Sequence, residues 1–95
     1  MLAVSPDGGS IAFEYYDYVT GGEQNIYVLE LNTGKIKNLT GKLDGRSYCP
    51  SWSPDSTKIA FTLETVNNTG IYIMNADGSN LIKLIDNGLW SSWQK

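Results

Sequence analysis

The feature that most constrains this chain of 95 residues is an internal repeat. The segment SPDGGSIAF at residues 5–13 returns 48 residues later as SPDSTKIAF at residues 53–61. NIYVL at residues 25–29 returns 45 residues later as GIYIM, and YCPSW at residues 48–52 matches LWSSW at residues 89–93. Because self-similarity at this period is typical of repeat architectures, the sequence predicts two structural units and the start of a third.

Each unit contains short apolar segments between turn signals. Residues 11–16 follow a Ser-Pro-Asp-Gly turn, which predicts a tight hairpin. The runs at residues 26–31 and 71–74 are almost continuously apolar, which predicts strands covered on both faces. Residues 35–40 and 80–85 alternate between apolar and polar, as expected of outer strands with one wet face. Four strands in about 45 residues predict an all-β fold of two β-propeller blades, each a four-stranded antiparallel up-and-down sheet.

This pattern divides the chain into one propeller segment with three parts. We expect the first blade at about residues 1–44 and the second at about residues 48–86. Residues 89–95 are then the start of a further blade or a closing strand. Entry at Met1 in the middle of an innermost strand makes truncation from a longer propeller an expectation as well.

Composition excludes several classes of function. The net charge of -3 and the pI of about 4.6 have the wrong sign for a nucleic-acid binder. No apolar run reaches the length of a membrane span. Because His is absent, the usual triads and the usual metal ligand are absent too, and Cys49 is the single cysteine. We therefore predict no catalytic residue, no metal and no cofactor.

The motif Trp-Ser-Pro-Asp at residues 52–55, followed by Ile-Ala-Phe, Ile-Tyr-Ile-Met and Asp-Gly, resembles the TolB-like propeller repeat. This repeat is a relative of the tryptophan-aspartate (WD) repeats, and the resemblance covers nearly the whole chain twice. The first unit departs from it, with Ala3-Val4 in place of Ser51-Trp52. The resemblance implies a non-catalytic module for protein or ligand binding, located in the periplasm or outside the cytoplasm. No signal peptide is apparent in this chain, so the compartment stays open.

Several single residues have simple structural interpretations. Asp7 and Asp55 lie inside the turn motif, where a carboxylate hydrogen-bonds to turn amides. The loop at residues 75–80 is similar to a calcium loop but lacks a closing acidic ligand, so we expect a plain turn. Cys49 is expected to be a small buried hydrophobic residue. Trp52 and Trp93 occupy equivalent positions and are expected to pack between blades.

Topology indicates where binding takes place. In an up-and-down blade the short repeated turns share one rim, and the longer, divergent loops share the other. Divergent loops on a repeated scaffold usually carry function. The predicted binding residues on this loop side are Tyr16, Asp17, Tyr18, Arg46, Tyr48 and Trp90. Their aromatic and charged character predicts a protein or peptide partner.

Two blades do not close a ring, so the outer blade faces need a cover. We expect either a longer chain or self-association through the exposed blade faces, with a trimer of six blades favoured and a tetramer of eight as the alternative. Two other functions stay open. One is an accessory gating propeller of a prolyl-oligopeptidase-like peptidase, and the other is a carbohydrate-binding or lyase-type propeller.

Overall fold

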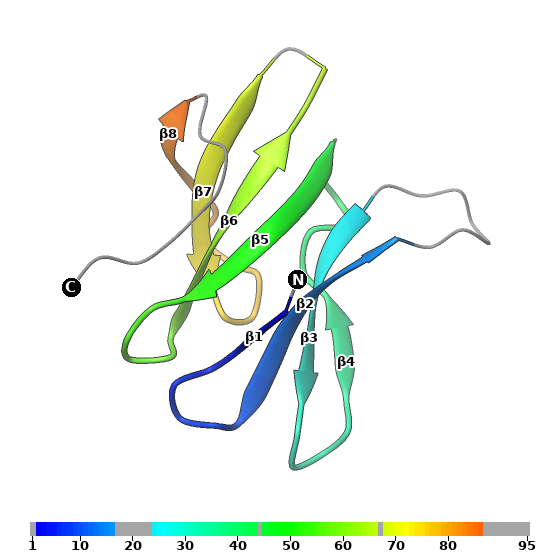
Figure 1. Ribbon diagram of the computed structural model, residues 1–95, viewed down its shortest axis with the longest axis vertical. Helices are drawn as coiled ribbons and strands as arrows, with labels where there is room; N and C mark the ends of the chain where they lie inside the picture. The colour runs from blue at the N-terminus through cyan, green and yellow to red at the C-terminus, as the bar shows by residue number, and fades with distance from the viewer. Residues whose placement is uncertain (1, 17–23, 44, 67, 87–95) are drawn as a thin grey trace.

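The computed structural model describes residues 2–16, 24–43, 45–66 and 68–86, which form two four-stranded antiparallel sheets (Figure 1). The first sheet contains β1 (Leu2–Val4), β2 (Ser10–Tyr16), β3 (Gln24–Glu30) and β4 (Ile36–Asn38). The second contains β5 (Arg46–Trp52), β6 (Lys58–Glu64), β7 (Thr69–Asn75) and β8 (Ile82–Asp86). Each strand pairs with the next one along the chain within its sheet. The prediction of an all-β chain with two up-and-down blades is confirmed.

The Ser-Pro-Asp motifs form the tight turns expected of them. The Gly8 amide donates to the Ser5 carbonyl at 2.8 Å, and Gly8 has a φ of 75°. In the second sheet the Ser56 amide donates to the Ser53 carbonyl at 2.9 Å, and Ser56 has a φ of 65°. Ser56 thus takes the left-handed conformation that glycine adopts without cost, so the turn geometry persists after the glycine is replaced.

The hydrophobic core lies between the two sheets. The first sheet contributes Ala12, Ile26 and Val28, whose side chains share one face by the strand register. The second sheet contributes Trp52, Ile59, Phe61, Leu63 and Met74. β5 lies against β1, β2 and β3 and forms the junction, which we call the seam (Figure 1).

The opposite face of the first sheet is exposed and uncharged. We call it the open face, and the register assigns to it Leu2, Val4, Ile11, Phe13, Tyr15, Asn25, Tyr27, Leu29, Ile36 and Asn38. Leu2 is 67% exposed and Ile36 is 61% exposed. Among these described residues none carries a charge, although 18% of the chain is charged. A contiguous apolar surface of this kind is typical of an interface.

Two expectations about strand environment need correction. Residues 26–31 were expected to be covered on both faces, but only Ile26 and Val28 are buried, while Tyr27 and Leu29 are half-buried on the open face. In β4 all three residues are exposed rather than alternating. For Tyr27, Leu29, Ile36 and Asn38 the reason is the same, since no described segment covers the open face, whereas Lys37 lies on the seam face of β4 and is exposed there.

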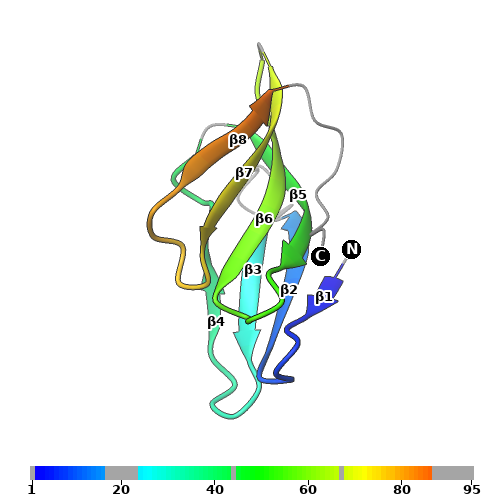
Figure 2. The same ribbon diagram turned by 90° about the vertical axis from the view of Figure 1, so that its left-hand side faces the viewer.

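The connections between strands lie on two rims (Figure 2). The turn rim holds residues 5–9, 31–35, 53–57 and 76–81. The loop rim holds the connections at the other ends of the strands, described at residues 39–43, 45, 65–66 and 68. Within the described ranges we find no helix long and apolar enough to cross a bilayer.

Candidate functional site

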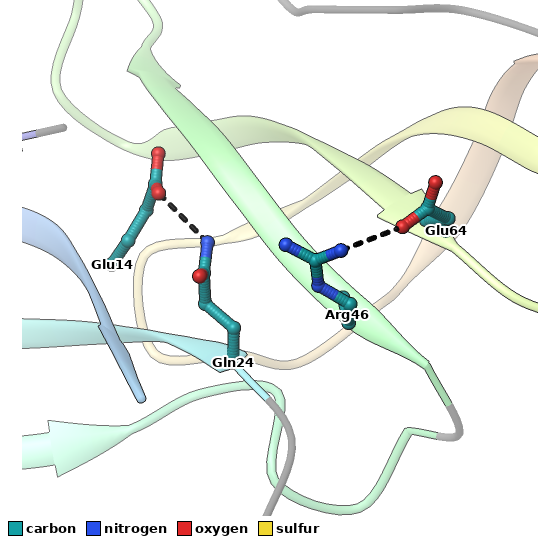
Figure 3. Close-up of polar contacts among 4 residues, drawn as sticks. All are labelled: Glu14, Gln24, Arg46 and Glu64. Carbon is teal, nitrogen blue, oxygen red and sulfur yellow. Dashed lines mark hydrogen bonds and ion pairs between the residues drawn. The ribbon is translucent and has the colours of Figure 1, made fainter. Parts of the chain in front are cut away.

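Polar side chains from both sheets gather at the loop rim (Figure 3). Glu14, near the end of β2, accepts a hydrogen bond at 2.7 Å from the side-chain amide of Gln24 at the start of β3. Its second carboxylate oxygen accepts the backbone amide of Cys49 in β5 at 2.9 Å. A single carboxylate of β2 therefore binds both β3 of the first sheet and β5 of the second sheet.

The backbone of β5 is shaped for this contact. The register between β5 and β6 shifts between Tyr48 and Ser51, and Cys49 has a φ of 55°. A bulge of this kind redirects backbone groups out of the ladder, and here it directs the Cys49 amide to Glu14. Cys49 is half-buried rather than buried, which corrects the expectation. Burial raises the pKa of its thiol, and the Glu14 carboxylate raises it further.

Arg46 lies at the outer side of this cluster. Its guanidinium forms an ion pair with Glu64 at 3.3 Å, and the two side chains are 54% and 41% exposed. The same guanidinium lies 5.9 Å from the ring centre of Tyr48. Burial is the main cause that raises the pKa of Tyr48, and the Glu64 carboxylate adds to it. Because more than half of the Arg46 side chain is exposed, its charge is accessible on the rim. Exposed ion pairs of this kind contribute little stability.

Gly45 fixes the approach of the chain into β5. It has a φ of 115°, and a Cβ at this position would collide with the carbonyl oxygen of Glu64. Only glycine combines that conformation with that close approach. The position of Arg46 at the rim therefore depends on the glycine that precedes it.

The structure brings part of the predicted site together. Arg46 and Tyr48 are in contact, and Tyr16 lies at the end of β2 with 39% exposure. Asp17, Tyr18 and Trp90 lie outside the described residues. The sequence analysis missed Glu14 and Gln24, which link the sheets. The available signal was a charged residue inside the otherwise apolar run of residues 11–16.

The aspartates of the turn rim have structural partners. Asp7 accepts the Ser5 hydroxyl at 2.6 Å and the Gly9 amide at 2.9 Å, as expected. Asp55 accepts the Ser53 hydroxyl at 2.7 Å and both the amide and the hydroxyl of Thr57. These hydrogen bonds, led by the one from Ser53, lower the pKa of Asp55 to about 2. In the loop at residues 75–80, Asp77 accepts the amide and hydroxyl of Ser79, as in a plain turn.

Known proteins are similar to this chain in sequence. A model of the TolB beta propeller domain matches residues 2–90. The Tol-Pal system protein TolB of Francisella tularensis subsp. mediasiatica is 37% identical over 85 residues, which are 87% of this chain and 19% of that protein. The TolB homolog of Chlorobaculum tepidum is 35% identical over 77 residues, 81% of this chain and 17% of its own length. The chain thus spans less than a fifth of the length of these relatives.

Solved structures show the same fold. A structure assigned to TolB from Agrobacterium tumefaciens superposes with a TM-score of 0.73 at 22% identity, covering 87% of this chain and 31% of that one. TolB from Acinetobacter baumannii superposes with a TM-score of 0.67 at 24% identity, covering 87% and 21%. Since the family model spans nearly the whole chain, this protein belongs to the TolB beta-propeller domain family.

Proposed function

We propose that this chain is a non-catalytic binding and scaffold module whose loop rim docks a protein or peptide. The observation that carries the proposal is the group of accessible aromatic and charged side chains there, with Tyr16 39% exposed at the end of β2 and the exposed Arg46–Glu64 pair at the same rim of the second sheet. Tyr and Arg are the residue types that dominate the energetics of protein interfaces. The turn aspartates support a non-catalytic role, because their hydrogen bonds hold turns.

The relatives suggest the kind of partner. All four proteins compared above carry TolB in their names, and the one from Francisella tularensis is named a Tol-Pal system protein. By family resemblance, the partner is a lipoprotein or another envelope protein, and the compartment is the periplasm. A rim that combines a paired arginine with exposed tyrosines fits a folded protein surface or an extended peptide.

A titration tests this proposal. The probe is Pal, the other protein in the name of the Tol-Pal system, taken in soluble form from the organism that encodes the chain. It is added to the labelled chain and to Tyr16→Ser and Arg46→Gln variants. Each variant is expected to bind about 10-fold more weakly, as for interface anchors. Lys58→Gln, at the turn-rim end of β6, is the matched control and should bind like the parent chain. Equal losses in all three variants, or no binding by the parent chain, would contradict docking of Pal at the loop rim.

We also infer that the open face is covered by a blade of a second copy. The residues of the second sheet equivalent to Phe13 and Tyr27 are Phe61 and Tyr72, which pack at the seam against the first sheet. The covering residues there are Ala12, Ile26 and Val28, and their equivalents on the far side of the second sheet are Ala60, Ile71 and Ile73. The chain thus carries both halves of a head-to-tail contact, and a trimer would contain six blades.

Light scattering during size exclusion tests self-association. A discrete trimer or tetramer is expected for the parent chain. Ile36→Lys places a charge on the open face and should yield a folded monomer. Val66→Lys makes a comparable change at a fully exposed loop-rim position and should leave the assembly intact. A monomeric parent chain would overturn self-association and favour cover by further repeats of a longer chain.

A further inference from the structure

A cleft of about 610 Å³ opens on the turn rim, where the two sheets meet. Its apolar lining comes from both sheets: Val28 and Leu39 from the first, Trp52 and Ala76 from the second. Val28 and Trp52 are 7% and 8% exposed, so they form the floor. Pockets for small ligands usually enclose about 300–1,000 Å³, and this cleft falls within that range.

Hydrogen bonds across the seam hold the cleft open in one shape. The indole N–H of Trp52 donates to the Ala3 carbonyl at 2.8 Å, which fixes the ring on the floor. The Asp7 amide also donates across the seam, to the Ser56 hydroxyl at 3.1 Å. Within the second sheet, the Ala76 amide donates to the Thr57 carbonyl at 2.9 Å. A ligand therefore meets a floor that is already ordered, which lowers the entropic cost of binding.

Charged groups of both signs line the cleft. Lys37 lies on the seam face of β4, since it pairs with Val28, and Lys35 lines the same side. Asp77 lines the second-sheet side, whereas Asp7 and Glu30 lie on the first-sheet side with the two lysines. Hydrogen bonds from Ser79 lower the pKa of Asp77, and the charge of Lys37 lowers it further. Among the described residues, Lys37 and Asp77 form no direct ion pair within 4.0 Å.

The two aspartates have acceptor capacity left for a ligand. Asp7 receives its hydrogen bonds from Ser5 and Gly9 on Oδ1, and Asp77 receives both bonds from Ser79 on Oδ1. For the described residues, the Oδ2 atom of each accepts no side-chain hydrogen bond. These ionised oxygens suit an ammonium or guanidinium group, and the two lysines suit a carboxylate.

We propose that this cleft binds an extended peptide segment with an aliphatic side chain between a basic and an acidic residue. The aliphatic side chain packs on the floor of Val28 and Trp52. The basic residue pairs with Asp77 or Asp7, and the acidic residue pairs with Lys37. Three extended residues span about 10 Å, which matches a site of this size. Apart from Leu39, which begins the loop-rim connection at residues 39–43, the lining named here lies away from the loop rim, and the site is independent of the function proposed above.

Amide chemical-shift mapping of the full 95-residue chain tests the proposal. The probes are acetyl-Lys-Leu-Glu-amide and its reverse, acetyl-Glu-Leu-Lys-amide, because the direction of binding is part of the question. At least one of them should cause saturable shifts at Lys37, Ala76 and the Trp52 indole, while Arg46 and Tyr48 stay unchanged. Acetyl-Lys-Ser-Glu-amide carries the same charges without the aliphatic side chain and should bind at least 5-fold more weakly.

Variants separate this site from general charge effects. Lys37→Gln and Asp77→Asn are each expected to weaken binding at least 3-fold. Lys58→Gln removes a lysine of the same rim that does not line the cleft and should bind like the parent chain. The proposal is overturned by absence of shifts with either leucine peptide at millimolar concentration, by equal binding of the serine peptide, or by equal effects of Lys37→Gln and Lys58→Gln. None of these results affects the test at the loop rim.

Discussion

Phe13 and Phe61 occupy the same place in the two repeats but have different surroundings. Phe13 stacks on Tyr27 with ring centres 5.8 Å apart, and Phe61 stacks on Tyr72 at 6.1 Å. Phe61 is fully buried at the seam, whereas Phe13 is half-buried on the open face. The repeat sequence thus determines the stacked Phe–Tyr pair in each sheet, while the neighbouring sheet determines how deeply that pair is buried.

Truncation of each phenylalanine gives the largest expected contrast. Phe61→Ala should lower the free energy of unfolding by about 3–5 kcal/mol, because it leaves a cavity in the core. Phe13→Ala should lower it by about 1–2 kcal/mol, since the side chain is only partly withdrawn from water. Urea denaturation at low protein concentration measures both. Equal losses would mean that the open face is covered in solution.

Replacing glycine by alanine should destabilise the connection between the two sheets more than a turn within one sheet. Gly45→Ala should lower the free energy of unfolding by about 3 kcal/mol, because the residue has a φ of 115° and its Cβ would meet the Glu64 carbonyl. Gly34→Ala is the matched control, with a φ of 75° and nothing within 4 Å of the added Cβ. It should cost about 1 kcal/mol, the strain of the left-handed conformation alone. Similar losses in thermal or urea denaturation would show that the Gly45 contact relaxes.

The carboxylate that joins the sheets distinguishes the repeats, because the equivalent of Glu14 is Thr62. Glu14→Ala leaves the Cys49 amide without its acceptor and should cost about 1–2 kcal/mol. Glu14→Gln keeps a side-chain oxygen that can accept the Cys49 amide, so it should lower the free energy of unfolding by less than about 1 kcal/mol. Hydrogen exchange at Cys49 should accelerate in the alanine variant and stay near the parent rate in the glutamine variant. Fast exchange at Cys49 in the parent chain would contradict the contact.

The smallest expected effect concerns pH and the turn aspartates. Hydrogen bonds lower the pKa of Asp7 and Asp55 relative to an ordinary aspartate, and more so for Asp55, at about 2. The contribution of these carboxylates to the stability of the fold is therefore complete above the unfolded-state pKa near 3.8 and is lost as the pH falls towards 2. The melting temperature should decline over that window. Asp55→Asn should flatten the decline more than Asp7→Asn, and identical profiles for both variants would contradict this ranking.

Much of the fold could be predicted because the repeats specify local structure. The Ser-Pro-Asp turns, the four strands per unit and the seam position of Trp52 all follow from short sequence patterns. Burial on β3 and β4 could not be predicted, since it depends on what lies opposite each face rather than on the strand itself.

The candidate site was less accessible to sequence reasoning. Arg46 and Tyr48 are close in sequence, so their contact follows from one strand. Glu14 and Cys49 are 35 residues apart, and their contact depends on a bulge that no local sequence pattern predicts. The cleft was missed because its lining combines repeated turns, which appear purely structural when each unit is considered alone.

The hydrogen bond from Trp52 to Ala3 has an evolutionary consequence. The donor is a side chain that the second repeat encodes, while the acceptor is a backbone carbonyl, which every residue provides. A tandem duplication that copies one repeat therefore also copies its attachment to the unit before it. The older unit needs no compensating mutation for this one hydrogen bond, so each added unit can form it from the start.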